Sequence, residues 1–414
     1  MQYKPSDTKE KEQILKLPKP FLNIAFLSTY PPRECGIATF TQDLVLEMKK
    51  KRYLKTCVIA VSDGDQHYGS DVLFDFPQQD RKSYTAAAER INRSDIQILI
   101  IEHEYGIYGG DSGEYLLDLI DRVKKPIVTT LHTVLPSPTE KQRTILKELC
   151  QKSTKIVTMT SSSRKVLQEV YGADPAKIEM IHHGVPDFKL PDRDALKGKF
   201  GLADRTIVST FGLISPGKGL EYGIEAIEQV VKKHPGVLYL ILGQTHPVVR
   251  KQRGEIYRSS LEKMVKELKL TDNVRFVNRY LTKEEIVWYL TLSDIYMTPY
   301  LDKDQAVSGT LAYAAGYGRV IVSTPYFYAR EMLADGRGLL ADFEDANSLA
   351  ERINFLIEHP EEKAAMEQRT LLLGKTMRWG SVADRYVKTF FHAANNFLSR
   401  GGAKNEGYNV QAAE

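Results

Sequence analysis

A single lysine within a glycine-rich turn is the strongest sign of chemistry in this sequence. Lys218 lies in the turn 215–219, between a β-branched run at 206–211 and an amphipathic helical pattern that begins at Leu220. A strand that ends at Gly212, followed by a turn through Gly217 into a helix, presents unpaired backbone N–H groups at the positive end of a helix dipole. This geometry binds phosphate. An ordinary strand–helix turn that happens to contain glycines stays open as the alternative.

The same turn fits the loop of nucleoside triphosphatases only in part. The segment 212–218 matches the spacing G-x-x-x-x-G-K, but the next residue is Gly219. That loop requires Ser or Thr at this position, because the hydroxyl holds the magnesium ion. The sequence therefore argues against a triphosphatase.

Polar side chains are also expected at the ends of two buried strands. His103 and Glu104 follow the apolar run 95–102, and His132 follows the run 126–131. Ligands of parallel sheets bind beyond the carboxyl ends of the strands, so these residues are expected to face a ligand. A hydrogen-bonded core histidine is the alternative for both His103 and His132.

No metal site is predicted. The histidines lack a ligand spacing such as HExxH. Two Asp-x-Asp patterns, at 63–65 and 302–304, fall in loops rich in turn residues, where Asp commonly stabilises the turn itself.

Composition excludes several classes of function. The chain has 414 residues with 57 basic and 53 acidic side chains, a balance that argues against nucleic acid as a partner. Three scattered cysteines, a charged amino terminus and the lack of an apolar run of ~20 residues predict a cytoplasmic protein without a transmembrane segment. The basic run 49–52 leaves peripheral contact with a membrane open, with a solvated helix end as the alternative.

The elements that must position these residues alternate between strands and helices, as in an α/β protein with parallel sheets. The pattern predicts an amino-terminal domain at 21–186, a linker at 187–205, a second domain at 206–378 and a further amphipathic helix at 379–398. The extension 1–20 and the tail 399–414 are predicted to be disordered.

The order of these motifs resembles that of the two-domain GT-B glycosyltransferases, and most closely the retaining group called family 4. The resemblance covers the chain from Leu22 to about Phe397 and rests on short motifs in a fixed order. It implies two facing Rossmann-like domains, with a carboxyl-terminal helix that crosses back onto the first. The motifs are Pro31-Pro32 with Gly36, His103-Glu104, Leu131-His132-Thr133, His183-Gly184-Val185-Pro186, Gly212 with Lys218-Gly219, and Gly318 before a late strand.

The resemblance also implies roles for individual residues. Lys218 would hold the diphosphate of a donor nucleotide sugar, and His103 would face the transferred sugar as a catalytic residue. Glu104 and His132 would contact the acceptor or the sugar. The remaining donor-binding residues would be Gly36, Gly212, Gly217, Arg279, Gln305, Ser308, Gly309, Thr310 and Tyr313.

Three positions depart from the family pattern. Gln305 and Tyr313 stand where the family usually has two glutamates that bind ribose or sugar hydroxyls, and Leu213 stands where an arginine is common. One cation for the diphosphate is therefore missing unless Arg279, Lys303 or Arg33 reaches the site.

The resulting hypothesis is a retaining hexosyltransferase. It would move a hexose from a nucleotide diphosphate sugar to a hydroxyl of a saccharide or glycoconjugate, without a metal or other cofactor. A sugar phosphorylase on the same fold and a non-catalytic binding protein are the alternatives. The sequence leaves the sugar, the base, the acceptor and the oligomeric state open.

Overall fold

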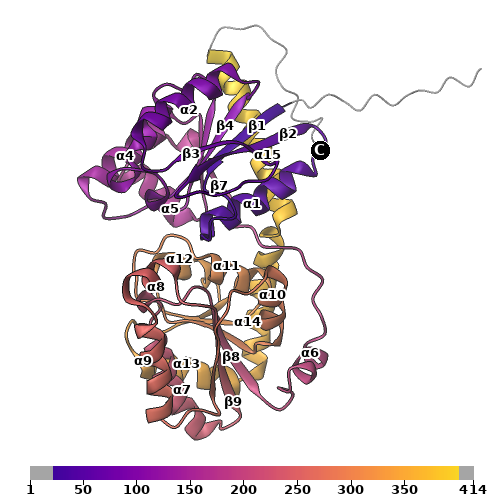
Figure 1. Cartoon of the computed structure of the whole chain (residues 1–414). Coiled ribbons are helices and arrows are strands. Elements are labelled where there is room, and N and C mark those ends of the chain that lie inside the picture. The colour runs from indigo at the N-terminus through magenta and orange to yellow at the C-terminus, as the bar shows by residue number, and fades with distance from the viewer. Residues whose placement is uncertain (1–21, 401–414) are drawn as a thin grey trace, which may run out of the picture.

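The computed structural model describes residues 22–400, without the side chain of Arg400. These residues form two α/β domains that face each other, and a long carboxyl-terminal helix runs from the second domain back along the first (Figure 1). The predicted extension 1–20 and residues 401–414 of the predicted tail lie outside the described residues. Ser399 and Arg400, which were assigned to the tail, instead end the last helix.

The first domain contains a seven-stranded parallel sheet in the order β3-β2-β1-β4-β5-β6-β7. Helices cover both faces, so β4 is buried along its whole length. The elements are β1 (Leu22–Ser28), α1 (Gly36–Lys49), β2 (Leu54–Ser62), β3 (Val72–Pro77), α2 (Arg81–Arg93), β4 (Ile98–His103), α3 (Tyr115–Ile120), β5 (Ile127–Leu131), α4 (Glu140–Lys152), β6 (Lys155–Thr158), α5 (Ser161–Glu169) and β7 (Ile178–Met180), with short 3-10 turns between some of them.

The second domain repeats this plan with six parallel strands in the order β10-β9-β8-β11-β12-β13. Its elements are α6 (Arg193–Lys199), β8 (Thr206–Phe211), α7 (Leu220–Lys233), β9 (Val237–Leu242), α8 (Pro247–Arg253), α9 (Ile256–Glu267), β10 (Val274–Val277), α10 (Lys283–Leu292), β11 (Ile295–Thr298), α11 (Gly309–Gly316), β12 (Ile321–Ser323), α12 (Phe327–Met332), β13 (Gly338–Leu340), α13 (Ala346–Glu358) and α14 (Pro360–Thr376).

Helix α15 (Trp379–Arg400) closes the structure, and the crossing that the resemblance implied is confirmed. Its apolar face packs on the first sheet, where Phe390 meets Phe26 with ring centroids 6.3 Å apart. At the crossing, the backbone N–H of Val185 donates to Met377 and that of Trp379 donates back to Val185. The two domains are therefore joined both by the segment after β7 and by the start of α15.

Both sheets reverse their strand order at one point, between β1 and β4 and between β8 and β11. In open α/β sheets the crevice at such a point is where ligands bind. The two crevices open toward the space between the domains, because the loops that follow these strands line a common cavity.

Some elements were missed by the sequence patterns. The segments β3, α8, α12 and β13 are short, and α6 lies within the predicted linker 187–205. Tyr326 and Tyr328 are fully buried at the start of α12.

The Asp-x-Asp pattern at 302–304 and the basic run 49–52 both form local contacts. Asp302 accepts from the backbone N–H of Asp304 at 3.0 Å and so stabilises a turn. In the basic run 49–52, Lys49 pairs with Asp71 and Lys51 with Asp384, so part of its charge is already paired. Between residues 22 and 400, no helix is long and apolar enough to span a membrane.

Candidate functional site

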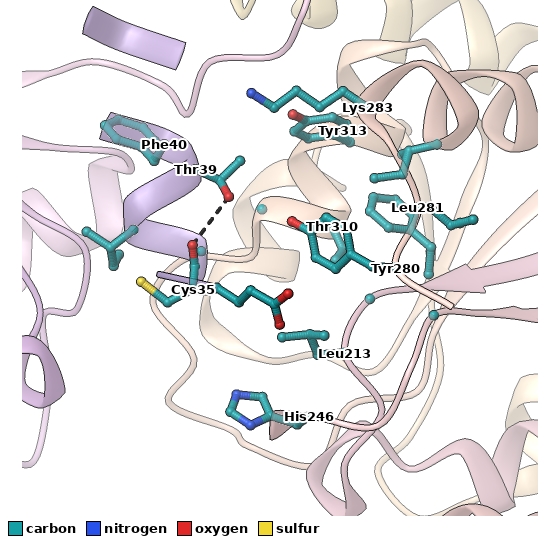
Figure 2. A pocket seen from close by; sticks show the side chains of 18 of the residues that line it. Cys35, Thr39, Phe40, Leu213, His246, Tyr280, Leu281, Lys283, Thr310 and Tyr313 are labelled. Carbon is teal, nitrogen blue, oxygen red and sulfur yellow. Dashed lines mark hydrogen bonds between the residues drawn. The ribbon is translucent and has the colours of Figure 1, made fainter. Parts of the chain in front are cut away.

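A cavity of about 720 Å³ lies between the two domains, of a size that suits a small organic ligand. Figure 2 shows residues of α1 on one side of it and residues of the second domain on the other. The first domain contributes Pro31–Ile37, Thr39, Phe40, Gln42, Asp43, Glu104, His132, Thr133 and His183, and the second contributes Phe211–Leu213, Ser215, Lys218, Leu242–Gln244, His246, Tyr280–Lys283, Ile286, Val307, Gly309, Thr310 and Tyr313.

Lys218 reaches this cavity from a rigid turn. The next residue, Gly219, has φ of 57°, and a Cβ there would lie 2.1 Å from the carbonyl oxygen of Pro299. Only glycine fits such a left-handed position against a neighbouring backbone. The turn therefore packs on the end of β11, and the Ser or Thr of a triphosphatase loop is excluded for a steric reason as well.

The ammonium of Lys218 is not neutralised by a carboxylate. Its Nζ lies 3.7 Å from the centre of the Tyr300 ring, whose hydroxyl is 2.7 Å from the hydroxyl of Thr310. Two other Lys or Arg side chains line the cavity, but Arg33 pairs with Asp63 and Lys283 pairs with Asp43. Within residues 22–400, Lys218 is thus the one lysine or arginine of this cavity that lacks a carboxylate partner.

Two helices begin at the same cavity, one from each domain. Ser308 caps α11 by accepting a hydrogen bond from the N–H of Leu311. Gly309 and Thr310, the first two residues of this helix, line the cavity. Cys35 caps α1 in the same way through Ala38, and Gly36 lines the cavity. The first N–H groups of a helix have no partner within it and carry the positive end of its dipole. Together with Lys218, these groups gather positive charge at one cavity, an arrangement that suits an anion.

A buried histidine–carboxylate pair lies on the wall made by the first domain. The Nε2 of His132 is 2.9 Å from Oε2 of Glu102, and these side chains are 6% and 0% exposed. With Glu102 ionised and the imidazole neutral, Nε2 donates to the carboxylate and Nδ1 is left as an acceptor. Phe40 packs edge-on against the imidazole at 4.7 Å and fixes its plane. Glu102 is a site residue that the sequence patterns missed, although a lone carboxylate in an apolar strand was a visible signal.

The expectation that His103 faces the cavity requires correction. Successive side chains of a strand point to opposite faces, so His103 is directed away from the face that Glu102 occupies. It is fully buried beside Tyr105 and Tyr108, outside the cavity lining, and neither ring nitrogen has a hydrogen-bond partner. Burial lowers the pKa of His103 to about 3. His132 contacts the cavity in its place.

The remaining predicted cations are engaged elsewhere. The guanidinium of Arg279 donates to both oxygens of Glu285, at 2.6 and 2.8 Å, on the surface. Lys303 lies over the ring of Phe343 at 5.9 Å, outside the cavity lining. Neither supplies the missing diphosphate cation. Arg33 does line the cavity, but its charge is paired with Asp63.

Gln305 and Tyr313, which stand at the two glutamate positions of the family pattern, lie in different surroundings. The side-chain amide of Gln305 donates to the carbonyl of Val307 at 3.1 Å and does not line the cavity. Tyr313 does line it, 8% exposed, with its ring 6.0 Å from that of Phe211. Burial holds the pKa of the Tyr313 phenol well above its usual value, so the hydroxyl stays a neutral donor.

The structure thus brings together only part of the predicted set. Gly217 and Ser308 flank the site without lining it, and His103, Arg279 and Gln305 are directed elsewhere. The predicted residues that line the cavity are Gly36, Glu104, His132, Gly212, Lys218, Gly309, Thr310 and Tyr313.

Polar contacts between the described residues of the two domains include an ion pair at the cavity and a carboxylate bound outside its lining. Asp43 of α1 pairs with Lys283 of α10. On the other side, the carboxylate of Glu331 accepts from the N–H groups of Ser161 and Ser162, at 2.7 and 2.8 Å.

Comparisons with known proteins agree with this architecture. Residues 36–187 match the family model described as Glycosyltransferase Family 4, and residues 192–371 match the one described as Glycosyl transferases group 1. A D-inositol 3-phosphate glycosyltransferase of Kineococcus radiotolerans is 23% identical over 309 residues, which are 68% of this chain and 70% of that protein. A GDP-mannose-dependent alpha-(1-6)-phosphatidylinositol monomannoside mannosyltransferase of Mycolicibacterium smegmatis is 24% identical over 54% of this chain and 58% of that protein.

Solved structures share the fold at lower identity. Anabaena HepE, solved in complex with UDP, has a TM-score of 0.71 with 17% identity over 89% of this chain and 99% of that one. Sucrose-phosphate synthase from Thermosynechococcus elongatus has a TM-score of 0.71 with 16% identity over 89% of this chain and 98% of that one. Since the two matched family models together span most of the described residues and both domains have the arrangement of these neighbours, the chain is a glycosyltransferase of the GT-B fold.

Proposed function

We propose that this glycosyltransferase is a retaining member of family 4 that transfers a hexose from a nucleotide diphosphate sugar to a hydroxyl group. The observation that carries the proposal is the unpaired ammonium of Lys218 beside the first turns of α1 and α11. These groups suit a diphosphate, which carries more negative charge once the sugar has left it. Fixed positive groups aimed at developing charge lower the barrier because they need no rearrangement during the reaction.

In this proposal the second domain binds the donor and the first domain binds the acceptor. The diphosphate lies between Lys218 and the N–H groups of Gly309 and Thr310, with Gly36 approaching from the first domain. The nucleoside extends toward Tyr280, Leu281 and Tyr313, which line the same wall. The other lining residues of the first domain, such as Arg33, Glu34 and Glu104, are left for the acceptor.

His132 is placed to orient the transferred sugar. Its protonated Nε2 is held by Glu102, so Nδ1 can accept a hydrogen bond from a sugar hydroxyl. For retention, the acceptor attacks from the side on which the diphosphate leaves, and a phosphate oxygen takes the acceptor's proton. No protein base is then required, and closure of the domains excludes water.

The names of related proteins support this choice of donor and outcome. Structures of Anabaena HepE contain UDP and UDP-glucose, and the relative from Mycolicibacterium smegmatis is named as GDP-mannose-dependent. That relative is also named for an alpha-(1-6) linkage, which retention would give from an α-linked donor. Relatives named for D-inositol 3-phosphate and for a phosphatidylinositol monomannoside make a polyol or glycoconjugate hydroxyl a suitable acceptor.

A ligand panel followed by product analysis tests the proposal. UDP, GDP and ADP are compared by thermal shift with and without EDTA, since a ligand at 100 times its Kd should stabilise the protein by about 2.7 kcal/mol. The matching nucleotide hexoses are then offered with sugar and polyol acceptors, and the anomeric configuration of the product is read by NMR. An inverted product would contradict retention. Turnover that depends on inorganic phosphate and not on nucleotides would instead identify a phosphorylase.

A further inference from the structure

The wall that the first domain contributes to the cavity contains one arginine and no lysine among its described residues. This wall, called the acceptor wall below, consists of the lining residues between 31 and 183. Its arginine, Arg33, is 14% exposed and its Nε lies 3.1 Å from a carboxylate oxygen of Asp63. An N–H of the same guanidinium donates to the amide oxygen of Gln78 at 3.0 Å. The one strong cation of the acceptor wall is therefore already paired.

The start of α5 offers no anion site either. This helix begins at the same edge of the first sheet, beyond β6, where free N–H groups would attract a phosphate. The carboxylate of Glu331 occupies that position, bound by the N–H groups of Ser161 and Ser162 and by the hydroxyl of Ser162 at 2.7 Å. Glu331 comes from α12 of the other domain, so the position is filled as long as the domains are closed.

The acceptor wall also presents two carboxylates without a cationic partner. Glu34 is exposed, and Glu104 accepts only from the hydroxyl of Thr133 at 2.5 Å and from the N–H of Tyr105. Neither forms an ion pair with a lysine or arginine between residues 22 and 400. Carboxylates accept hydrogen bonds from hydroxyl groups and repel a phosphate.

We propose that the acceptor is a sugar or polyol without a phosphate group near the reacting hydroxyl, recognised by carboxylates through its hydroxyls. This inference rests on the proposed function and narrows it. Three features carry it: the pairing of Arg33 by Asp63, the filling of the α5 start by Glu331, and the free carboxylates of Glu34 and Glu104. A phosphorylated acceptor would meet two negative groups and no free cation on this wall.

The test uses matched acceptors with the full-length protein. Glucose is compared with glucose 6-phosphate, and myo-inositol with myo-inositol 3-phosphate. Binding is measured by calorimetry with the donor side saturated by the nucleotide that binds best, and transfer is measured with the corresponding nucleotide hexose. We expect the phosphorylated member of each pair to bind no more tightly than the neutral one and to accept the hexose more slowly. A phosphorylated member that is preferred about tenfold or more would overturn the inference.

A charge variant tests the physical reason. Asp63→Asn releases Arg33, and a released guanidinium should bind the phosphate of glucose 6-phosphate at least about tenfold more tightly than the wild type does. Asp65→Asn is the matched control, since Asp65 makes the same charge change two residues away and forms no ion pair among residues 22–400. Equal affinity of the wild type and Asp63→Asn for glucose 6-phosphate would refute the argument from Arg33.

The outcomes separate this inference from the function on which it rests. If no nucleotide binds, the proposed function fails and the inference fails with it. If a nucleotide binds and the nucleotide sugar is consumed, but only phosphorylated acceptors are glycosylated, the proposed function stands and the inference alone is wrong.

Discussion

Replacement of Lys218 by methionine is the most direct perturbation of the proposed donor site. The variant keeps most of the side-chain length over the Tyr300 ring and removes only the charge. Since no carboxylate pairs with this ammonium within the described residues, its charge is available to a ligand. A contact between unit charges at 4 Å and an effective dielectric constant of 20 is worth about 4 kcal/mol. Removal of one preorganised contact in other enzymes costs about 2.7–4 kcal/mol, or about 10²–10³ in rate.

We therefore expect Lys218→Met to lower kcat/KM for the nucleotide sugar by about 10²–10³. Its free energy of unfolding should change by no more than about 1 kcal/mol, the range of a partly exposed cation–π contact. The assay is the initial rate of nucleotide release at subsaturating donor, together with denaturant unfolding of both proteins.

Arg279→Met is the matched control, because it removes another cation of the same domain. The guanidinium of Arg279 is paired with Glu285 and does not line the cavity. Its kcat/KM should stay near that of the wild type. The reasoning would be refuted if Lys218→Met retained wild-type activity, or if the two variants lost activity equally.

Further predictions concern the histidines and the crossing of the chain. His132→Gln keeps a donor for Glu102 and should lower kcat/KM by about 10². His103→Phe should leave kcat/KM near the wild-type value. A steady-state assay in which His103→Phe loses more activity than His132→Gln would show that His103 belongs to the site. Because burial lowers the pKa of His103 to about 3, the unfolded chain binds a proton below about pH 6.5 that the folded chain does not. The free energy of unfolding is therefore unaffected by the protonation of His103 above pH 6.5. It decreases as the pH falls from 6.5 toward 3, by up to about 1.4 kcal/mol per pH unit. Denaturant unfolding at pH 7, 6 and 5 should show a weaker loss for His103→Phe, and identical pH profiles would contradict this assignment. Gly184→Ala would place a Cβ 2.2 Å from the Trp379 ring, so it should destabilise the protein by about 1–3 kcal/mol in thermal or denaturant unfolding. Gly380→Ala has open space around its Cβ and is the control; an equal loss in both variants would show that the contact with Trp379 is not the cause.

Much of the architecture could be predicted from the sequence, because it follows from local patterns. Continuous apolar runs such as 98–101 and 237–242, separated by amphipathic helices, are typical of parallel strands covered on both faces. The turn with Lys218 was recognisable because a strand, a glycine-rich turn and an amphipathic helix follow one another there, although an ordinary turn remained the alternative. The helix that begins at Trp379 was visible from its amphipathic pattern. The strand β13 has three residues, too few to show a period, and β3 is a largely exposed strand at the edge of its sheet, without the continuous apolar run of the central strands.

The roles of single side chains were harder to predict than the elements that carry them. The resemblance supplied a histidine at each of two strand ends, and the sequence offered no criterion to choose between His103 and His132. Metal independence, retention and cytoplasmic location stay predictions.

What the sequence determined by itself is therefore the succession of strands, turns and helices, since hydrophobic period and glycine position act over a few neighbouring residues. Only the tertiary structure decided which groups are free to act. The pleat of β4 directs Glu102 toward His132 and leaves His103 in the core. Asp63 neutralises Arg33 and Glu331 fills the start of α5, through contacts between residues 30 and about 170 positions apart. The charge that a ligand meets depends on these pairings. The first forms when the first domain folds, and the second forms when the two domains meet.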